Sequence, residues 1–159
     1  MFNLMKKKKD TIFFSPTIGK VVDIGEVNDP VFSKKILGEG YAIIPESNEV
    51  FSPVKGEIVS IFPTKHAISI LTNAGDEVLI HMGIDTVALN GAPFKLFVKP
   101  GDIVDENSLL ATMDLRIIER EQKESTIMII FTNKENVKEF LLESRGLAQN
   151  GQYLGKVSH

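Results

Sequence analysis

A pair of aliphatic segments separated by a turn signal constrains the fold of this chain more than any other feature. The first segment contains Ile68, Ile70 and Leu71, the second is Val78-Leu79-Ile80, and Asn73-Ala74-Gly75-Asp76 lies between them. This pattern predicts a β-hairpin, because the turn contains residue types that accept a positive φ angle. The chain is therefore expected to be organised around antiparallel strands.

Two of the three histidines stand at the ends of this hairpin, His66 before the first segment and His81 after the second. A turn centred between Asn73 and Ala74 would place His66 directly opposite His81. It would also place Ile68 opposite Leu79. Directly opposed residues have Cβ atoms about 5 Å apart, whereas a slip of one residue moves a side chain to the other face. The sequence thus predicts adjacent imidazoles in this particular register. The third histidine, His159, is the last residue and is expected to be mobile.

Most of the remaining chain also favours short strands. A Ser-Pro-x-x-Gly turn followed by a strand occurs at 15–24 and again at 52–61, which indicates a duplicated β unit unless the similarity is a coincidence. Further strands are expected at 11–14, 41–44, 84–89, 94–98, 109–115 and 126–131. The predicted fold class is all-β, an antiparallel β-sandwich or barrel with a duplicated hybrid motif and one or two short helices.

The two expected helices have recognisable start signals. Asp29-Pro30 is a capping carboxylate followed by proline, and the short helix that it opens carries Val31, Phe32, Ile36 and Leu37 and ends at Gly38. So short a helix cannot bury all four apolar residues, and some of them are expected to face outward. Thr132 and Glu135 form a capping box that predicts a longer helix over 132–145.

Composition limits the classes of function. The net charge of −3 gives no general attraction to nucleic acid, and the absence of cysteine excludes disulfides and thiolate chemistry. No segment reaches the roughly 20 apolar residues of a membrane-spanning helix, and the start is not a secretory signal. The basic block Lys6–Lys9 allows at most weak contact with an anionic membrane, or else serves as a solubilising arm. We expect a flexible basic tail over 1–10 and a single domain over 11–159, standing alone as a cytoplasmic protein.

The histidine pair has several possible uses. Each imidazole could be an ordinary half-buried side chain, but two facing imidazoles are costly if both are charged and useful if one stays neutral. A zinc site needs three or four ligands, and the nearest carboxylates are Asp85 and Glu77, so no metal is expected. Nucleophilic-serine and phosphate-loop motifs are absent. A histidine nucleophile that accepts a phosphoryl group remains, with a carbonyl near Gly83 orienting His81.

One stretch carries a family resemblance. Val78-Leu79-Ile80-His81-Met82-Gly83-Ile84-Asp85-Thr86-Val87, together with Thr64-Lys65-His66-Ala67, resembles the glucose-type IIA component of the bacterial phosphoenolpyruvate-dependent sugar phosphotransferase system. The resemblance extends from about Thr11 to the C-terminus. It implies a β-sandwich that carries a phosphoryl group without a cofactor. His81 would be the phosphorylated residue, His66 its stabilising neighbour and Thr64 the partner of His66, with Gly83 and Asp85 beside the site.

The resemblance also implies two protein partners, the histidine phosphocarrier protein as donor and the IIB domain of a sugar permease as acceptor. The partner-binding surface would comprise residues around the histidines, namely Asp29, Val31, Phe32, Ile36, Leu37, Phe62, Leu79 and Val87. The sequence departs from the enteric members of the family at four positions on the expected rim of this surface, namely Pro63, Lys65, Leu79 and Met82. The regulatory partners of the enteric members are therefore not expected to carry over to this chain. Neither the sugar nor adventitious zinc binding by the two histidines follows from the sequence.

Two rival functions come from other classes. A lipoyl- or biotinyl-type module would need an exposed lysine between methionine or aspartate neighbours at a hairpin tip, and no such tripeptide is present. A zinc hydrolase would need metal-ligand spacings such as His-x-His, which are absent, and metal analysis of the purified chain would test for it.

Overall fold

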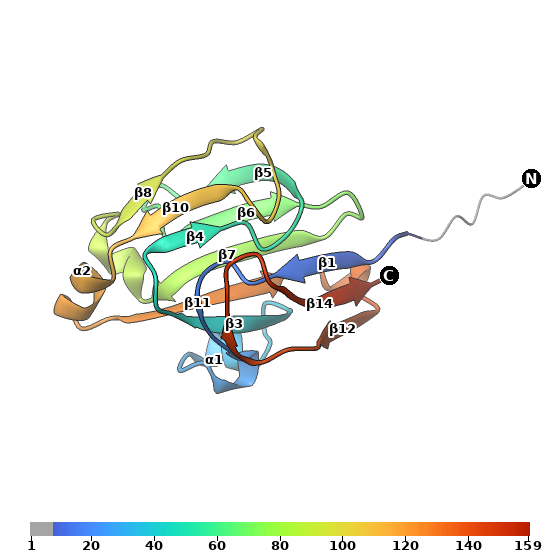
Figure 1. Ribbon diagram of the computed structural model, residues 1–159, viewed down its shortest axis with the longest axis horizontal. Helices are drawn as coiled ribbons and strands as arrows, with labels where there is room; N and C mark the ends of the chain where they lie inside the picture. The colour runs from blue at the N-terminus through green and yellow to red at the C-terminus, as the bar shows by residue number, and fades with distance from the viewer. Residues whose placement is uncertain (1–7) are drawn as a thin grey trace, which may run out of the picture.

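The computed structural model describes residues 8–159, so the expectations for residues 1–7, including Lys6 and Lys7, lie outside the described part (Figure 1). Antiparallel sheets dominate this part of the chain. The largest has eight strands in the order β13 (Gly146–Ala148), β2 (Gly19–Asp23), β3 (Glu39–Pro45), β11 (Glu124–Phe131), β7 (Glu77–Ile84), β6 (Ala67–Leu71), β5 (Gly56–Ile61) and β9 (Ile103–Val104).

Two smaller sheets complete the β structure. One contains β1 (Thr11–Phe14), β14 (Tyr153–Ser158) and β12 (Glu139–Leu142), and the other contains β4 (Glu49–Phe51), β10 (Leu109–Met113) and β8 (Phe94–Leu96). The helical elements are α1 (Pro30–Ser33), α2 (Leu115–Arg120) and the single 3₁₀ turns η1 (Ile24–Glu26), η2 (Thr86–Leu89) and η3 (Lys134–Asn136). In residues 8–159 no helix is long and apolar enough to cross a membrane.

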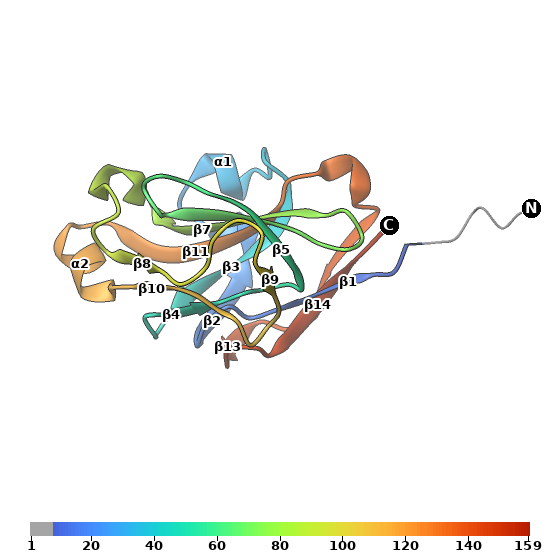
Figure 2. The same cartoon turned by 90° about the horizontal axis from the view of Figure 1, so that it is seen from above.

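The eight-stranded sheet has apolar residues on both faces. Figure 2 shows α1 on one side of this sheet and β8, β10 and β4 on the other. The main core, which includes Phe13, Ile68, Ile80 and Ile129, lies between the sheets, and a second cluster of Val22, Ile24, Val27, Phe32, Ala42, Ile84, Met128 and Ile130 lies beneath the α1 segment. The predicted all-β antiparallel sandwich with two short helices is confirmed, and the sheets do not close into a barrel.

The duplicated unit is also present in the structure. Ser15 Oγ donates to the carbonyl of Thr17 at 2.7 Å, and Ser52 Oγ donates to the carbonyl of Val54 at 2.6 Å, so both Ser-Pro turns are closed by the same bond. The strands β2 and β5 then begin at the glycine of each copy, Gly19 and Gly56.

The predicted hairpin is correct, but its register is wrong by one residue. Ala67 pairs with His81 and Ile68 pairs with Ile80. The turn is centred on Ala74 because Thr72 N–H donates to the Asp76 carbonyl at 2.9 Å, which closes a loop with an odd number of residues. The side chain of Asp76 is buried in this turn, and its hydrogen bonds stabilise the loop that sets the register.

The predicted helix over 132–145 is wrong. Only the short turn η3 is helical, and β12 then pairs with β14. Phe140 of β12 stacks on Phe13 with ring centroids 5.1 Å apart, and it also packs against Phe131. Pairing with β14 and burial against these rings outweigh the local capping signal, because helix propensity is a weak preference that tertiary contacts override.

Two predicted strands end earlier than expected. The strand predicted to reach Leu115 stops at Met113, because Asp114 caps α2 by accepting from Arg116 N–H at 3.0 Å. The strand predicted over 84–89 is wrong: Ile84 is the last residue of β7, Asp85 adopts a left-handed φ of 60°, and Thr86–Leu89 form the 3₁₀ turn η2. The helix start at Asp29-Pro30 is confirmed, with Asp29 Oδ1 accepting from Val31 N–H at 2.9 Å, but α1 ends at Ser33, so the predicted extent to Gly38 is wrong and Ile36 and Leu37 lie outside the helix.

Candidate functional site

The imidazoles of His66 and His81 lie side by side, with ring centroids 4.9 Å apart and planes at 74°. They meet although the two residues are not directly paired. His66 precedes β6 in a turn where Lys65 has a φ of 61°, so the alternation of side chains along the strand does not extend to it. Its carbonyl still accepts from Met82 N–H at 2.7 Å, which holds the His66 backbone against β7. The turn at 62–66 thus brings the two imidazoles together, although the predicted strand register does not occur.

The tautomer of His81 follows from its hydrogen bond. His81 Nδ1 lies 2.9 Å from the carbonyl oxygen of Gly83. A carbonyl can only accept, so Nδ1 carries the proton and donates it. In the neutral ring, Nε2 is then left with a free lone pair. His81 is half-buried and therefore offers a nucleophilic nitrogen at the end of β7.

His66 is held by a different partner. Its Nδ1 lies 2.5 Å from Thr64 Oγ1, as the resemblance implied. When the hydroxyl donates to Nδ1, the remaining proton of the neutral ring sits on Nε2, which can then donate to a group on His81. The His66 side chain is only 5% exposed, and such burial restricts the ring to a few orientations. The pair therefore combines a nucleophile with a hydrogen-bond donor.

Both imidazoles favour the neutral form. Burial lowers the pKa of His66. Burial also lowers the pKa of His81, and so does the neighbouring His66, whereas the Gly83 carbonyl and the carboxylates of Asp29 and Asp85 act in the opposite direction. Asp29 and Asp85 thus contribute electrostatically, although the Asp29 side chain is also engaged as the cap of α1.

Aromatic side chains flank the two histidines. The ring of Phe32 lies 5.0 Å from that of His81, and the ring of Phe62 lies 5.4 Å from that of His66. Phe32 was expected on the partner surface, but it is only 6% exposed and belongs to the cluster beneath α1. In this four-residue helix Phe32 faces the sheet and packs into the second cluster, whereas Val31 faces outward.

The other residues of the expected partner surface do reach the outside. Leu79 is half-buried, and five side chains are exposed, namely Val31, Ile36, Leu37, Phe62 and Val87. Met82 is fully buried in the core, so its departure from the enteric pattern does not alter this surface. An exposed apolar group of this size beside a polar pair is typical of an interaction surface.

A separate polar cluster was missed by the sequence reasoning. His159 is not mobile: its Nε2 lies 2.9 Å from Asp76 Oδ2, and both side chains are buried. This cluster sits at the turn of the β6–β7 hairpin, at the end away from His66 and His81. Only the position of Asp76 in the turn could have indicated it, because nothing local shows that the C-terminus returns there. In residues 8–159 no three His, Asp or Glu side chains form a group that could hold a metal ion.

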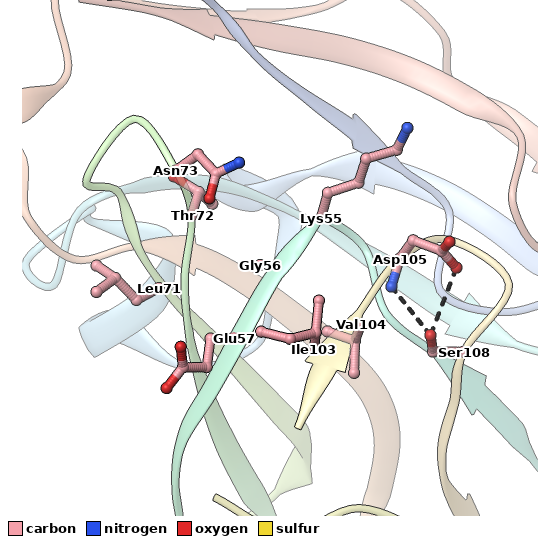
Figure 3. Close-up of a pocket in the computed structure, with 10 residues that line it drawn as sticks. All are labelled: Lys55, Gly56, Glu57, Leu71, Thr72, Asn73, Ile103, Val104, Asp105 and Ser108. Carbon is pink, nitrogen blue, oxygen red and sulfur yellow. Dashed lines mark hydrogen bonds between the residues drawn. The ribbon is translucent and has the colours of Figure 1, made fainter. Parts of the chain in front are cut away.

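A surface hollow of about 380 Å³ lies at the edge of the large sheet, between β5, β6 and β9 (Figure 3). The charged side chains at its rim do not converge, since Lys55 and Glu57 point in opposite directions (Figure 3). Asp105 and Ser108 bond to each other, with Asp105 N–H donating to Ser108 Oγ at 2.9 Å. The hollow contains no histidine and is not the chemical site.

A β-sandwich with two adjacent neutral histidines defines a class of histidine-dependent protein, and comparison with known families identifies that class. Residues 11–137 match the family of the phosphoenolpyruvate-dependent sugar phosphotransferase system, EIIA 1. The chain belongs to this family of phosphotransferase-system components.

Individual relatives narrow the comparison. The chain is 40% identical over 148 residues to the PTS system glucose-specific EIIA component of Halalkalibacterium halodurans, covering 88% of this chain and 85% of the relative. It is 48% identical over 129 residues to the PTS system glucosamine-specific EIICBA component of Bacillus subtilis, covering 81% of this chain but 20% of that longer protein. The solved structure of glucose permease IIA from Mycoplasma capricolum matches with a TM-score of 0.84 at 33% identity, over 98% of this chain and 99% of the other.

Proposed function

We propose that the chain is a phosphoryl carrier that accepts phosphate on His81 Nε2 and passes it to a second protein. The observation that carries the proposal is the bond from His81 Nδ1 to the Gly83 carbonyl, since it leaves Nε2 as the free nucleophile beside His66. Membership of the EIIA 1 family supports the same conclusion. Residues 11–159 would act as a single domain, working in the cytoplasm.

In the accepting step, His81 Nε2 attacks the phosphorus of a phosphohistidine on the donor protein. The new N–P bond forms as the N–P bond of the donor breaks, and the donor imidazole leaves with the electron pair. Negative charge spreads over the phosphoryl oxygens in such a transfer, and positioned donors stabilise it. His66 Nε2–H is the donor that the geometry offers, because Thr64 occupies its other nitrogen. The neutral His81 that the lowered pKa favours is the nucleophilic form.

In the passing step, a thiolate of the acceptor attacks the same phosphorus. The S–P bond forms while the N–P bond to His81 breaks, and the Nε2 lone pair returns to the ring. Nδ1 keeps its proton throughout, donating a hydrogen bond to the Gly83 carbonyl, so neither step requires a proton to cross the site. We propose the histidine phosphocarrier protein as donor and the IIB domain of a sugar permease as acceptor. The EIICBA relatives, of which this chain spans about a fifth, support the second partner.

Both partners would dock on the exposed apolar residues around the histidines. Phe62 lies beside His66, the exposed Val31 and Ile36 belong to the segment whose Phe32 ring lies beside His81, and Asp29 and Asp85 place negative charge near His81. Apolar anchors give affinity, while complementary charges speed the encounter and select the partner. A donor and an acceptor with an apolar centre and a cationic rim would fit this surface. The relatives named glucose-specific support a glucose-type sugar as the final acceptor.

The decisive experiment is intact-mass measurement before and after incubation with phosphoenolpyruvate and the general phosphotransferase proteins. We expect the wild type to gain one phosphoryl group and His81→Ala to gain none. His66→Gln should still accept phosphate, because its amide N–H can donate to a phosphoryl oxygen, but it should fail to pass the phosphate to a purified IIB domain. Labelling that persists in His81→Ala would refute the assignment, and an unlabelled wild type would refute the function.

A further inference from the structure

The segment that follows His81 contains a buried hydroxyl that the transfer steps above do not use. Thr86, the first residue of η2, is fully buried. We propose that Thr86 is a positioning residue, which holds the Gly83 carbonyl in place and thereby keeps His81 in the tautomer with a free Nε2. The inference rests on the proposed role of His81 as the phosphoryl acceptor.

The contacts of Thr86 reach both sides of Gly83. Its Oγ1 donates to the carbonyl of Met82 at 2.6 Å, which anchors the peptide immediately before Gly83. Its methyl group lies beside the Gly83 Cα, since a Cβ built on Gly83 would be 2.3 Å from Thr86 Cγ2 and 3.1 Å from Thr86 Oγ1. The hydroxyl and the methyl group therefore hold the backbone on both sides of the Met82–Gly83 peptide, and the next carbonyl, that of Gly83, accepts the hydrogen bond from His81 Nδ1–H.

Sheet pairing does not hold this backbone by itself. The β7–β11 ladder is regular from Val78 to Met82, but an irregularity follows, and Gly83 has no partner in the register. Gly83 has a φ of 88° and Asp85 a φ of 60°, so the chain leaves the strand conformation at these positions. The ladder resumes at Ile84, which pairs with Glu124, so Gly83 lies within an irregularity, where a glycine has access to many backbone orientations. Packing against Thr86 restricts Gly83 to the one in which its carbonyl faces His81.

The orientation of this carbonyl decides where the proton of His81 lies. With the carbonyl in place, the Nδ1–H form is stabilised by a hydrogen bond that the Nε2–H form cannot make. Without it, the two tautomers become comparable, and in the Nε2–H form the lone pair is on Nδ1, so Nε2 cannot attack phosphorus. The side chain of Thr86 would thus act on the reaction through the Gly83 carbonyl, without touching the phosphoryl group.

The test compares three variants of the full chain by nitrogen NMR of the imidazoles and by the rate of phosphoryl acceptance. Thr86→Val keeps the shape of the side chain but removes the hydroxyl, and Thr86→Ser keeps the hydroxyl. Thr72→Val is the matched control, because it removes a buried hydroxyl that bonds to Asp76 N–H at the far end of the same hairpin. The wild type should show His81 almost wholly as the Nδ1–H tautomer.

We expect Thr86→Val to raise the Nε2–H population of His81 and to slow acceptance about fivefold, the equivalent of one net hydrogen bond. Thr86→Ser should restore the wild-type tautomer, and Thr72→Val should leave both the tautomer and the rate unchanged. A wild-type tautomer in Thr86→Val would overturn the inference while leaving the carrier function intact. A tautomer shift of equal size in Thr72→Val would also overturn it, because the effect would then be general destabilisation. A wild type that accepts no phosphate would refute the carrier function instead.

Discussion

The buried Asp76 offers a quantitative test of how the fold holds the histidine hairpin. Its carboxylate accepts from the hydroxyls of Thr11 and Thr72, from Asn136 Nδ2 at 2.9 Å and from His159 Nε2 at 2.9 Å. These partners come from β1, the hairpin turn, η3 and the last residue of the chain. Figures 1 and 2 both show the β6–β7 turn next to the C-terminus. One side chain thus joins the hairpin turn to three distant segments.

Replacing Asp76 by alanine should destabilise the protein severely. The substitution removes the acceptor shared by Asn136 and by the buried side chains of Thr11, Thr72 and His159. An unsatisfied buried donor costs about 1–3 kcal/mol, so we expect a total loss of about 4 kcal/mol. A domain of this size typically unfolds with a free energy of about 5–15 kcal/mol, so the loss is a large share of the total. At roughly 2–4 °C per kcal/mol, we expect the midpoint of thermal unfolding to fall by about 12 °C.

The measurement is thermal and urea unfolding followed by circular dichroism. Glu77→Ala is the control, because it removes the same charge one residue further along the chain from an exposed side chain, and it should change the unfolding free energy by less than about 0.5 kcal/mol. If Asp76→Ala were no less stable than Glu77→Ala, the cluster would not hold the hairpin turn. Phosphoryl acceptance by folded Asp76→Ala should persist below its unfolding midpoint, since the histidines lie at the other end of the strands.

Three further predictions concern the histidine site. Phe32→Ala should cost about 3–5 kcal/mol of unfolding free energy and, by admitting water beside the ring, raise the pKa of His81 in an NMR titration; an unchanged pKa would contradict this reason. Burial lowers the pKa of both histidines in the folded state, so below about pH 6.5 the unfolded state binds more protons than the folded state. The free energy of unfolding in urea should therefore decrease as the pH falls from about 6.5, until the folded-state pKa values are passed. The double variant His66→Gln/His81→Gln should show a shallower decrease between about pH 6.5 and 5, and an equal slope would refute the linkage. Ile36→Asp should slow acceptance from the donor protein about tenfold at unchanged stability, whereas Ile103→Asp, on the exposed sheet edge, should not; equal effects of both would argue against a local docking surface.

The sequence predicted that the two imidazoles would be neighbours, but the strand register used to justify this prediction was wrong. Pairing His66 directly with His81 was wrong, yet their rings meet, because the turn around Lys65 redirects His66 after the ladder ends. The interactions of Thr64 and Gly83 with the two rings agree with prediction because each joins residues only two positions apart. Contacts this local are available to sequence reasoning. The burial of Phe32 depends on the sheet beneath it and was not available.

Local chemistry in the sequence determined the hairpin, the repeated Ser-Pro turns, the capped turn at Asp29 and the bonds of Thr64 and Gly83 to the two histidines. Tertiary structure decided what local preference left open. Residues 139–142 became a strand because β14 offered an edge and Phe13 offered a ring to pack against. His159 became a buried partner of Asp76 because β14 ends beside the hairpin turn. Hydrogen bonds and apolar burial between segments far apart in the chain outweigh propensities of a few tenths of a kcal/mol per residue, and no local pattern reveals which distant segment will supply them.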